Sequence, residues 1–145
     1  MIQIIIINGP NLNLLGVRQP EIYGNKSFDD YFMELETAFP ALNLHYYQSN
    51  HEGDIIDKIH AVGYRFDGII LNAGGFTHTS IAIADALRAI TSPVVEVHLT
   101  NIYERETFRH TNYIKDSAIH SIVGKGLEGY KEAIEFLRVN VIKVQ

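Results

Sequence analysis

Two residues of this chain form a pair that could transfer a proton. Glu96 and His98 are two positions apart in an apolar run that predicts a strand, so both side chains point to the same face of the sheet. A carboxylate beside an imidazole fixes the orientation of the ring and favours its protonated form. His98 therefore has the surroundings of a general acid, with Glu96 as the group that orients it.

A second set of reactive side chains lies in a long loop after the first predicted strand. Residues 8–24 contain three asparagines, three glycines and two prolines. This composition predicts no regular element, because proline removes backbone donors and glycine raises the entropy cost of ordering. Connections in compact α/β domains usually run about 2–6 residues, and this one carries Arg18 and Tyr23. We expect an active-site segment or a lid, although a loop anchor and a solvated charge are the more ordinary interpretations of these two residues taken singly.

The elements that must position these residues alternate along the chain. Strands are predicted at 2–7, 42–46, 68–71, 93–99 and 118–123, and helices at 28–39, 51–62, 81–90 and 127–141. A short helical or irregular stretch is expected after the fourth strand. Alternating strands and helices predict an α/β fold with a parallel sheet between two layers of helices. The leading expectation is a flavodoxin-like three-layer sandwich with five strands in the order 2-1-3-4-5.

In that strand order a ligand site lies beyond the carboxyl ends of strands 1 and 3, where the winding direction reverses. Polar and titratable residues gather at this edge. The long loop follows strand 1, residues 72–80 follow strand 3, residues 96–101 end strand 4, and Arg105 and Arg109 come next. Most connections at the opposite edge contain fewer polar and titratable residues. The asymmetry favours an enzyme over a scaffold.

Composition restricts the class of protein. The 145 residues suit a single domain, 1–145, and 46% hydrophobic with 20% charged residues is typical of a globular protein. The net charge of −5, without a cluster of lysine and arginine, argues against a nucleic-acid partner. No apolar stretch approaches the roughly 18 residues of a membrane span. The first residues show no basic region and no small-residue cleavage site, so we expect no signal peptide. We expect a cytoplasmic protein that does not bind membranes.

Several standard site motifs are absent from the sequence. The first loop lacks the P-loop lysine, no Gly-x-Ser-x-Gly elbow occurs, and strands 1 and 3 lead into Asn8 and Asn72 rather than into the acids of a phosphorelay receiver. With no cysteine and no His-Glu-x-x-His motif, a metal site is not expected. His45, His60 and His120 are interpreted as packed or solvated histidines.

Residues around the third helix have competing interpretations. His78 either binds a ligand or makes a hydrogen bond at the start of that helix, and Thr79 or Ser80 caps it. Asp85 falls in the middle of the helix among alanine and isoleucine. A charge there needs a partner, such as a group from another subunit.

Motifs spread over nearly the whole chain occur together in one known family. They are Asn8-Gly-Pro-Asn-Leu-Asn-Leu-Leu-Gly16, Arg18, Pro20, Tyr23-Gly24, Gln48-Ser-Asn-His-Glu-Gly53, Thr77-His-Thr-Ser80, Asp85-Ala-Leu87, Val95-Glu-Val-His98, Asn101-Ile102 and Phe108-Arg-His110. In this order and combination they are highly specific. The chain closely resembles the type II 3-dehydroquinate dehydratases.

The resemblance implies a cofactor-free, reversible dehydration of 3-dehydroquinate to 3-dehydroshikimate in the shikimate pathway of aromatic amino acid biosynthesis. Water is eliminated with anti geometry through an enolate. Carried over by position, Tyr23 is the base that removes the proton beside the carbonyl, and Arg18 favours the tyrosinate. A free tyrosine is almost wholly protonated at pH 7, and a nearby guanidinium stabilises the anion. His98, paired with Glu96, protonates the departing hydroxyl.

The same resemblance implies the substrate contacts. Asn11 helps to hold a water that stabilises the enolate. The residues that match ligands of the substrate hydroxyls are Asn72, His78 and Arg109. The substrate carboxylate is expected on the backbone amides of Leu99 and Thr100 and on the Thr100 hydroxyl, because amides that leave a strand suit an anion.

Asp85 matches a residue that reaches into a neighbouring subunit's site, and the resemblance implies a homododecamer built from trimers. The chain also departs from the common family pattern at a few positions, none of which removes a proposed catalytic group. These are Gln19 for Glu, Asp54 for Glu, Ala73 for Pro, and Gly75-Phe76 for Ala-Tyr. We expect activity to survive these differences, which bear on loop dynamics and on substrate affinity.

Two other classes of function stay open on the sequence alone. A flavodoxin-like module that binds a cyclic polyol acid without turnover would use the predicted hydroxyl ligands, but it gives no reason for the predicted base, the acid and their charged partners to occur together. A structural assembly protein would not need the polar and titratable residues that gather at the carboxyl edge of the predicted sheet. The sequence also leaves open whether an active enzyme serves biosynthesis or quinate breakdown.

Overall fold

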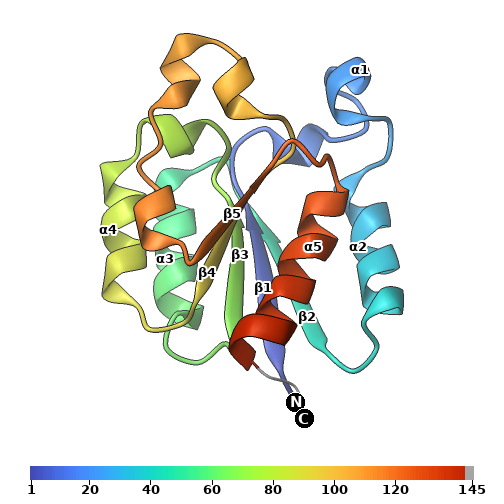
Figure 1. Cartoon of the computed structure of the whole chain (residues 1–145), viewed down its shortest axis with the longest axis vertical. Coiled ribbons are helices and arrows are strands. Elements are labelled where there is room, and N and C mark those ends of the chain that lie inside the picture. Colours follow the sequence, from blue (N-terminus) through green and yellow to red (C-terminus); the bar gives the residue numbers. More distant parts are fainter. Residues whose placement is uncertain (143–145) are drawn as a thin grey trace.

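The computed structural model describes residues 1–142, apart from the side chain of Tyr23. Its sheet has five parallel strands in the order β2-β1-β3-β4-β5 (Figure 1). The strands are β1 (Gln3–Asn8), β2 (Asn43–Gln48), β3 (Gly68–Asn72), β4 (Val94–His98) and β5 (His120–Val123). The flavodoxin-like order predicted from the sequence is confirmed, with strand ends displaced by no more than two residues.

Helices cover both faces of this sheet. The longer ones are α2 (Phe28–Ala38), α3 (Glu52–Val62), α4 (Ile81–Ala89) and α5 (Glu128–Leu137). α2 and α5 pack on one face, and α3 and α4 pack on the other (Figure 1). α5 continues into a π-helical turn, Arg138–Ile142, so the last predicted helix changes its hydrogen-bond pattern before it ends.

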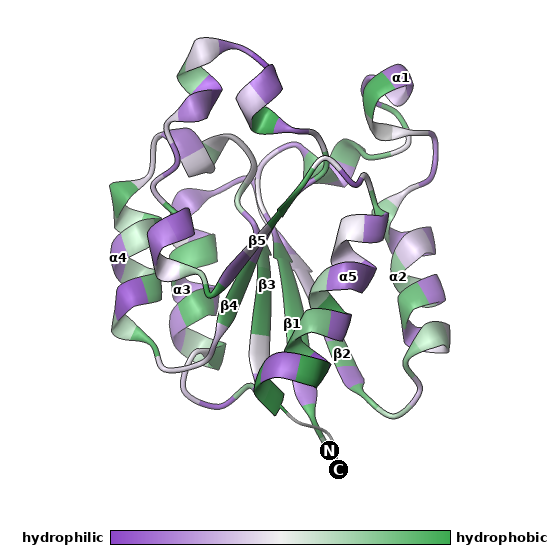
Figure 2. Cartoon of the chain, in the orientation of Figure 1, coloured by the Kyte–Doolittle hydropathy of each residue, from purple (hydrophilic) through white to green (hydrophobic). Residues whose placement is uncertain are grey.

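The run of isoleucines in β1 explains why both faces are covered. Ile4 and Ile6 are buried in the layer formed with α2 and α5, whereas Ile5 and Ile7 are buried against α3 and α4. Alternate side chains of a strand point to opposite faces, so a strand that is apolar at every position requires a layer on each side. Figure 2 shows largely hydrophobic strands between helices that carry both hydrophilic and hydrophobic residues.

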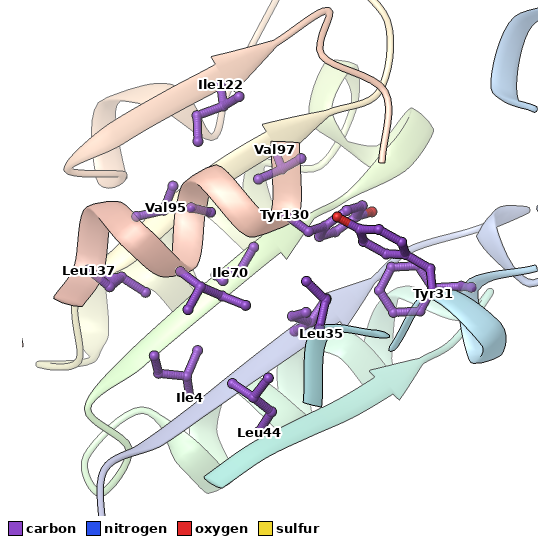
Figure 3. Close-up of a cluster of buried hydrophobic side chains, with 14 of the residues drawn as sticks. Ile4, Tyr31, Leu35, Leu44, Ile70, Val95, Val97, Ile122, Tyr130 and Leu137 are labelled. Atoms are coloured by element: carbon purple, nitrogen blue, oxygen red, sulfur yellow. The ribbon is translucent and has the colours of Figure 1, made fainter. Parts of the chain in front are cut away.

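Aromatic rings pack within the α2–α5 layer. Tyr130 of α5 has no exposed surface, and its ring centre lies 4.9 Å from that of Phe28, nearly edge-on. Tyr31 of α2 lies beside it (Figure 3). The buried tyrosine is thereby held at a fixed place over the sheet.

The loop between β1 and α2 is more regular than the sequence predicted. It contains a 3-10 turn, η1 (Leu12–Leu14), and a single helical turn, α1 (Pro20–Tyr23). Pro20 takes the first position of α1, where a backbone N–H would have no partner inside the helix. Asn11 and Gln19 precede the two turns with φ values of 70° and 44°. The prediction of a wholly irregular loop is therefore wrong, because proline and left-handed residues here start short turns rather than prevent them.

Short turns also follow β3 and β4, as expected for the stretch after the fourth strand. They are η2 (Gly74–His78), η3 (Ile102–Glu104), η4 (Thr107–His110) and η5 (Lys115–Ser117). In Figure 1, α1 and the segment that contains η3 and η4 stand above the carboxyl ends of the strands. These turns supply the side chains that border the sheet edge.

The β1 loop and the β3 loop approach each other closely at Gly9, where an added Cβ would lie 2.5 Å from the carbonyl oxygen of Ala73. Because the obstacle is backbone, we expect Gly9→Ala to lower the free energy of unfolding by about 1–3 kcal/mol, measured by urea titration with circular dichroism. Gly53→Ala is the matched control, since no atom lies within 4 Å of its added Cβ. Equal stability of the two variants would contradict the close approach.

Candidate active site

A cavity of about 160 Å³ lies at the carboxyl edge of the sheet. Its wall is built from the β1–α2 loop, the turn after β3 and the segment after β4, which lie together at the top of Figure 1. Most of the predicted site residues line it, namely Asn11, Arg18, Asn72, His78, His98, Leu99, Thr100 and Arg109. The fold thus gathers side chains from three segments that are distant in sequence.

Two predicted residues lie outside the cavity wall. Glu96 is buried directly behind His98. Asp85, on α4, is exposed and forms an ion pair with Arg88 at 3.1 Å, so this charge has a partner within its own helix. For Tyr23, the backbone ends α1, and the side chain lies outside the described residues.

The Glu96–His98 pair has the geometry that the sequence predicted. The side chains are 1% and 4% exposed, and His98 Nε2 donates a hydrogen bond of 2.7 Å to Glu96 Oε2. Because Nε2 is bound to the carboxylate, Nδ1 is the ring nitrogen available to a ligand in the cavity. The arrangement can present a charged imidazole as a proton donor.

Two more side chains bind the buried carboxylate of Glu96. Asn112 Nδ2 donates to Oε2 at 2.8 Å, and Ser121 Oγ donates to Oε1 at 2.7 Å. Burial raises the pKa of the Glu96 carboxyl. The hydrogen bond and positive charge of His98, together with these two donors, lower it by a larger amount, so the pKa lies below its ordinary value. The carboxylate is therefore ionised at neutral pH.

Sequence reasoning missed Asn112 and Ser121. Ser121 pairs with Glu96 in the β4–β5 register, so the predicted strand order combined with a correct register would have found it. Asn112 comes from the connection between η4 and η5, and no strand or helix periodicity marks it. Its position depends on how the turns fold back over the sheet.

His78 is fixed from behind by the backbone. Its Nδ1 donates to the carbonyl oxygen of Thr111 at 2.7 Å, so in the neutral ring Nε2 is an acceptor. Burial lowers the pKa of His78, and the positive charges of His98 and Arg109 act in the same direction. Ser80, rather than His78, caps α4. His78 therefore offers the cavity an acceptor for a hydroxyl group, which favours the ligand interpretation over the helix-start one.

The last residues of β1 and β3 are asparagines that pair side by side, Asn8 with Asn72. The Tyr130 hydroxyl joins them, since it accepts from Asn72 Nδ2 at 2.9 Å and donates to Asn8 Oδ1 at 2.9 Å. Asn72 Oδ1 accepts from the Gly74 N–H at 3.1 Å, which sets the orientation of its amide. Burial raises the pKa of Tyr130 well above its usual range, so this phenol stays neutral and acts as a hydrogen-bond partner.

Three guanidinium groups border the cavity, those of Arg18, Arg105 and Arg109, although the chain as a whole carries a net charge of −5. Arg105 donates to Thr100 Oγ1 at 3.3 Å, and Arg109 pairs with Glu106 at 3.1 Å. The sequence placed Arg105 in this segment but assigned it no role. Local charges decide which ligand a cavity attracts, and these favour a small anion.

The histidines interpreted as packed or solvated are placed away from the cavity. The ring centre of His45 lies 4.9 Å from that of Phe66, His120 stacks on Phe136 at 4.1 Å, and His60 is exposed. Within residues 1–142, no three His, Asp or Glu side chains gather as a metal ion would require. No helix in the described part of the chain combines the length and apolar character of a membrane span.

A second hollow of about 350 Å³ lies at the opposite edge of the sheet, around the residues that precede β3 and β4. It is more open to solvent, and the described residues that line it include no histidine, asparagine or glutamine. The carboxyl-edge cavity is smaller but holds the acid–base pair, oriented amides and cations. This combination suits proton transfer on a small anionic molecule that carries hydroxyl groups.

Tyr130→Phe should leave Asn72 Nδ2 and Asn8 Oδ1 without their shared partner inside the protein. Leaving buried polar groups unsatisfied costs about 1–3 kcal/mol, so we expect a fall of that size in the free energy of unfolding, measured by urea titration. Tyr47→Phe removes the same atom from a half-buried tyrosine for which no hydrogen bond is seen among the described residues, and it should change stability little. A Tyr130 variant as stable as the Tyr47 variant would show that the hydroxyl bridge contributes nothing.

Comparison with known proteins gives the family. The sequence profile described as "Dehydroquinase class II" matches residues 2–138. A 3-dehydroquinate dehydratase of Halothermothrix orenii is 50% identical over 145 residues, which cover 99% of this chain and 97% of the relative. Catabolic 3-dehydroquinase 1 of Aspergillus fumigatus is 49% identical, with 94% of this chain and 93% of the relative covered. The crystal structure of type II dehydroquinase from Butyrivibrio crossotus superposes with a TM-score of 0.91 at 42% identity, covering 94% of this chain and 97% of that one. This chain belongs to the class II dehydroquinase family.

Proposed function

We propose that this chain is a hydro-lyase that converts 3-dehydroquinate reversibly to 3-dehydroshikimate without a cofactor. The observation that carries the proposal is the buried Glu96–His98 pair at a cavity bordered by three arginines, in a chain of the class II dehydroquinase family. The substrate is a small carboxylate with several hydroxyl groups, which matches the chemistry of the cavity lining.

The proposed reaction is an anti elimination through an enolate. The Tyr23 phenolate takes the proton from the carbon beside the ketone, and the electron pair of that C–H bond forms the enolate. Arg18 stabilises the phenolate by its positive charge, and Asn11 holds a water that stabilises the enolate oxygen. The enolate then collapses, the C–O bond breaks, and His98 Nδ1 gives its proton to the departing hydroxyl, which leaves as water. The proton on Tyr23 returns to His98 through solvent.

The remaining predicted residues recognise the substrate in this proposal. The Leu99 and Thr100 amides and the Thr100 hydroxyl bind its carboxylate, close to the Arg105 guanidinium. Its hydroxyl groups meet the Asn72 amide, the His78 imidazole and the Arg109 guanidinium. The fixed amide of Asn72 and the neutral ring of His78 support this, because both offer defined hydrogen-bonding atoms to a neutral hydroxyl.

We also infer a cytoplasmic enzyme whose single domain, 1–145, assembles as a homododecamer of trimers, as the family resemblance implies. The position of Asp85 supports a shared site, because its side chain is exposed on α4, outside its own chain's cavity wall. Asp85 then completes the site of a neighbouring subunit. The proposed pathway is the shikimate route to aromatic amino acids, and the Aspergillus fumigatus relative makes quinate breakdown the alternative to test in cells.

Tyr23→Phe tests the proposed base. We expect kcat for the appearance of conjugated-enone absorbance from 3-dehydroquinate to fall by at least ~10³-fold, because a phenyl ring cannot accept a proton. Binding of 3-dehydroquinate, measured by calorimetry, should survive. Tyr47→Phe is the control and should keep wild-type turnover. Loss of binding together with turnover would assign Tyr23 to recognition, and a wild-type chain that binds without turnover would make the protein a binding module.

Mixed oligomers test whether Asp85 acts across a subunit boundary. Tyr23→Phe and Asp85→Ala subunits should each be nearly inactive alone. After joint unfolding and refolding in equal amounts, about one quarter of the sites would combine an intact Tyr23 with a neighbour's intact Asp85, and activity should recover toward that fraction. Mixing Tyr23→Phe with His98→Gln is the control, because both residues belong to one subunit's site and no recovery follows. Activity no higher than the sum of the separate variants would contradict a shared site.

A further inference from the structure

The carboxylate of Glu96 is held by more groups than the proposed acid needs. It is 1% exposed and accepts hydrogen bonds from His98, Asn112 and Ser121. The three donors come from β4, from the connection between η4 and η5, and from β5. A buried carboxylate is tolerated only when hydrogen bonds and a positive partner replace its hydration. Of the three donors, His98 lines the cavity, whereas Asn112 and Ser121 do not. These two bind the carboxylate from outside the cavity wall.

The amide of Asn112 has one possible orientation. Its Oδ1 accepts from the backbone N–H groups of Ile114 at 2.9 Å and Lys115 at 3.1 Å. The amide nitrogen must then point the other way, toward Glu96 Oε2. Asn112 thus ties the first turn of η5 to the carboxylate and leaves no freedom for an amide flip.

Ser121 holds the second oxygen of the same carboxylate. It is the register partner of Glu96 on β5, and its hydroxyl donates to Oε1 at 2.7 Å. With Oε1 held by Ser121 and Oε2 by Asn112, the plane of the carboxylate is set. Oε2 then meets His98 Nε2 at 2.7 Å.

We propose that Asn112 and Ser121 are positioning residues for the dehydration: they orient the Glu96 carboxylate and stabilise its charge, so that His98 keeps Nε2 on Glu96 and directs Nδ1 to the departing hydroxyl. This inference rests on the proposed function, since it concerns the groups behind the same acid. Neither residue touches the substrate. Their effect passes through Glu96 to His98.

Among the described residues, few other ionisable groups lie around this pair. His78 of η2 interacts with His98 and Glu96 through their charges, and Arg109 of η4 acts on His78. Tyr103 of η3 has its hydroxyl 3.5 Å from Asn112 Nδ2. The neighbouring positions on β3 and β5 are Leu71 and Ser121, which carry no charge. Two further elements nearby, α4 and η5, also carry charged residues. Asp85 and Arg88 of α4 pair with each other at the surface, and Lys115 of η5 is exposed. The two neutral donors are therefore the groups to change.

The test is the pKa of Glu96 and the kcat in the variants Asn112→Ala and Ser121→Ala. A carboxyl whose pKa is depressed in the folded protein works above that pKa and fails as the pH falls through it. Removing one donor should raise the pKa of Glu96 by about one unit. We expect kcat near neutral pH to fall about 3–10-fold with KM nearly unchanged, because the substrate contacts remain.

The pKa of Glu96 is also measured directly, without substrate, from the side-chain carboxyl signal of 13C-glutamate-labelled protein. Ser92→Ala is the matched control, since Ser92 Oγ donates to the Phe66 carbonyl at 2.7 Å before β4 begins, away from Glu96. It should leave the pKa of Glu96 and kcat unchanged. Asn112→Ala also removes the oxygen that accepts from the Ile114 and Lys115 N–H groups, which could unfold η5. Ser121→Ala leaves those bonds in place and still tests the proposal. An unshifted pKa of Glu96 in both variants would overturn the proposal. A raised pKa in a chain whose wild type shows no turnover would instead overturn the proposed function.

Discussion

An ionised carboxylate inside the sheet is the constraint on which the site depends. Burying such a charge costs several kcal/mol unless a positive partner and hydrogen bonds replace water. Glu96 meets this requirement through His98, Asn112 and Ser121. These bonds hold β4, β5 and the turns between them in one arrangement. They also decide which nitrogen of His98 faces the cavity, so structural stability and acid chemistry rest on the same contacts.

The strand order is a second constraint on the site. Reversal of the winding direction leaves the ends of β1 and β3 side by side, and Asn8 and Asn72 pair there. The Tyr130 hydroxyl reaches them from α5 on one face of the sheet. Since burial raises the pKa of Tyr130, the link is a neutral hydrogen-bond chain. A helix in the core thus binds the amide nitrogen of a residue in the cavity wall.

The cavity also shows why total charge is a poor guide to the ligand of an enzyme. The chain has a net charge of −5, yet three arginines border the space where the strands end. Charges more than about 10 Å apart at the surface are largely screened at moderate salt. The guanidinium groups close to the cavity therefore outweigh the acidic residues elsewhere, which fits a family whose relatives are named for a small organic anion.

The strand order 2-1-3-4-5 is the leading expectation for this pattern of elements. The sequence by itself determined the alternation of strands and helices, the covering of both faces of β1 and the shared face of Glu96 and His98. These follow from local periodicity, because side chains repeat every second residue in a strand and about every 3.6 in a helix. It also singled out Arg18 and Tyr23 through the composition of one loop, although it missed the short turns η1 and α1 there. Only the tertiary structure decided that Asn112 and Ser121 hold Glu96, and that Tyr130 binds Asn8 across 122 positions of chain. Such contacts depend on strand register and on the path of irregular turns, which no local pattern encodes.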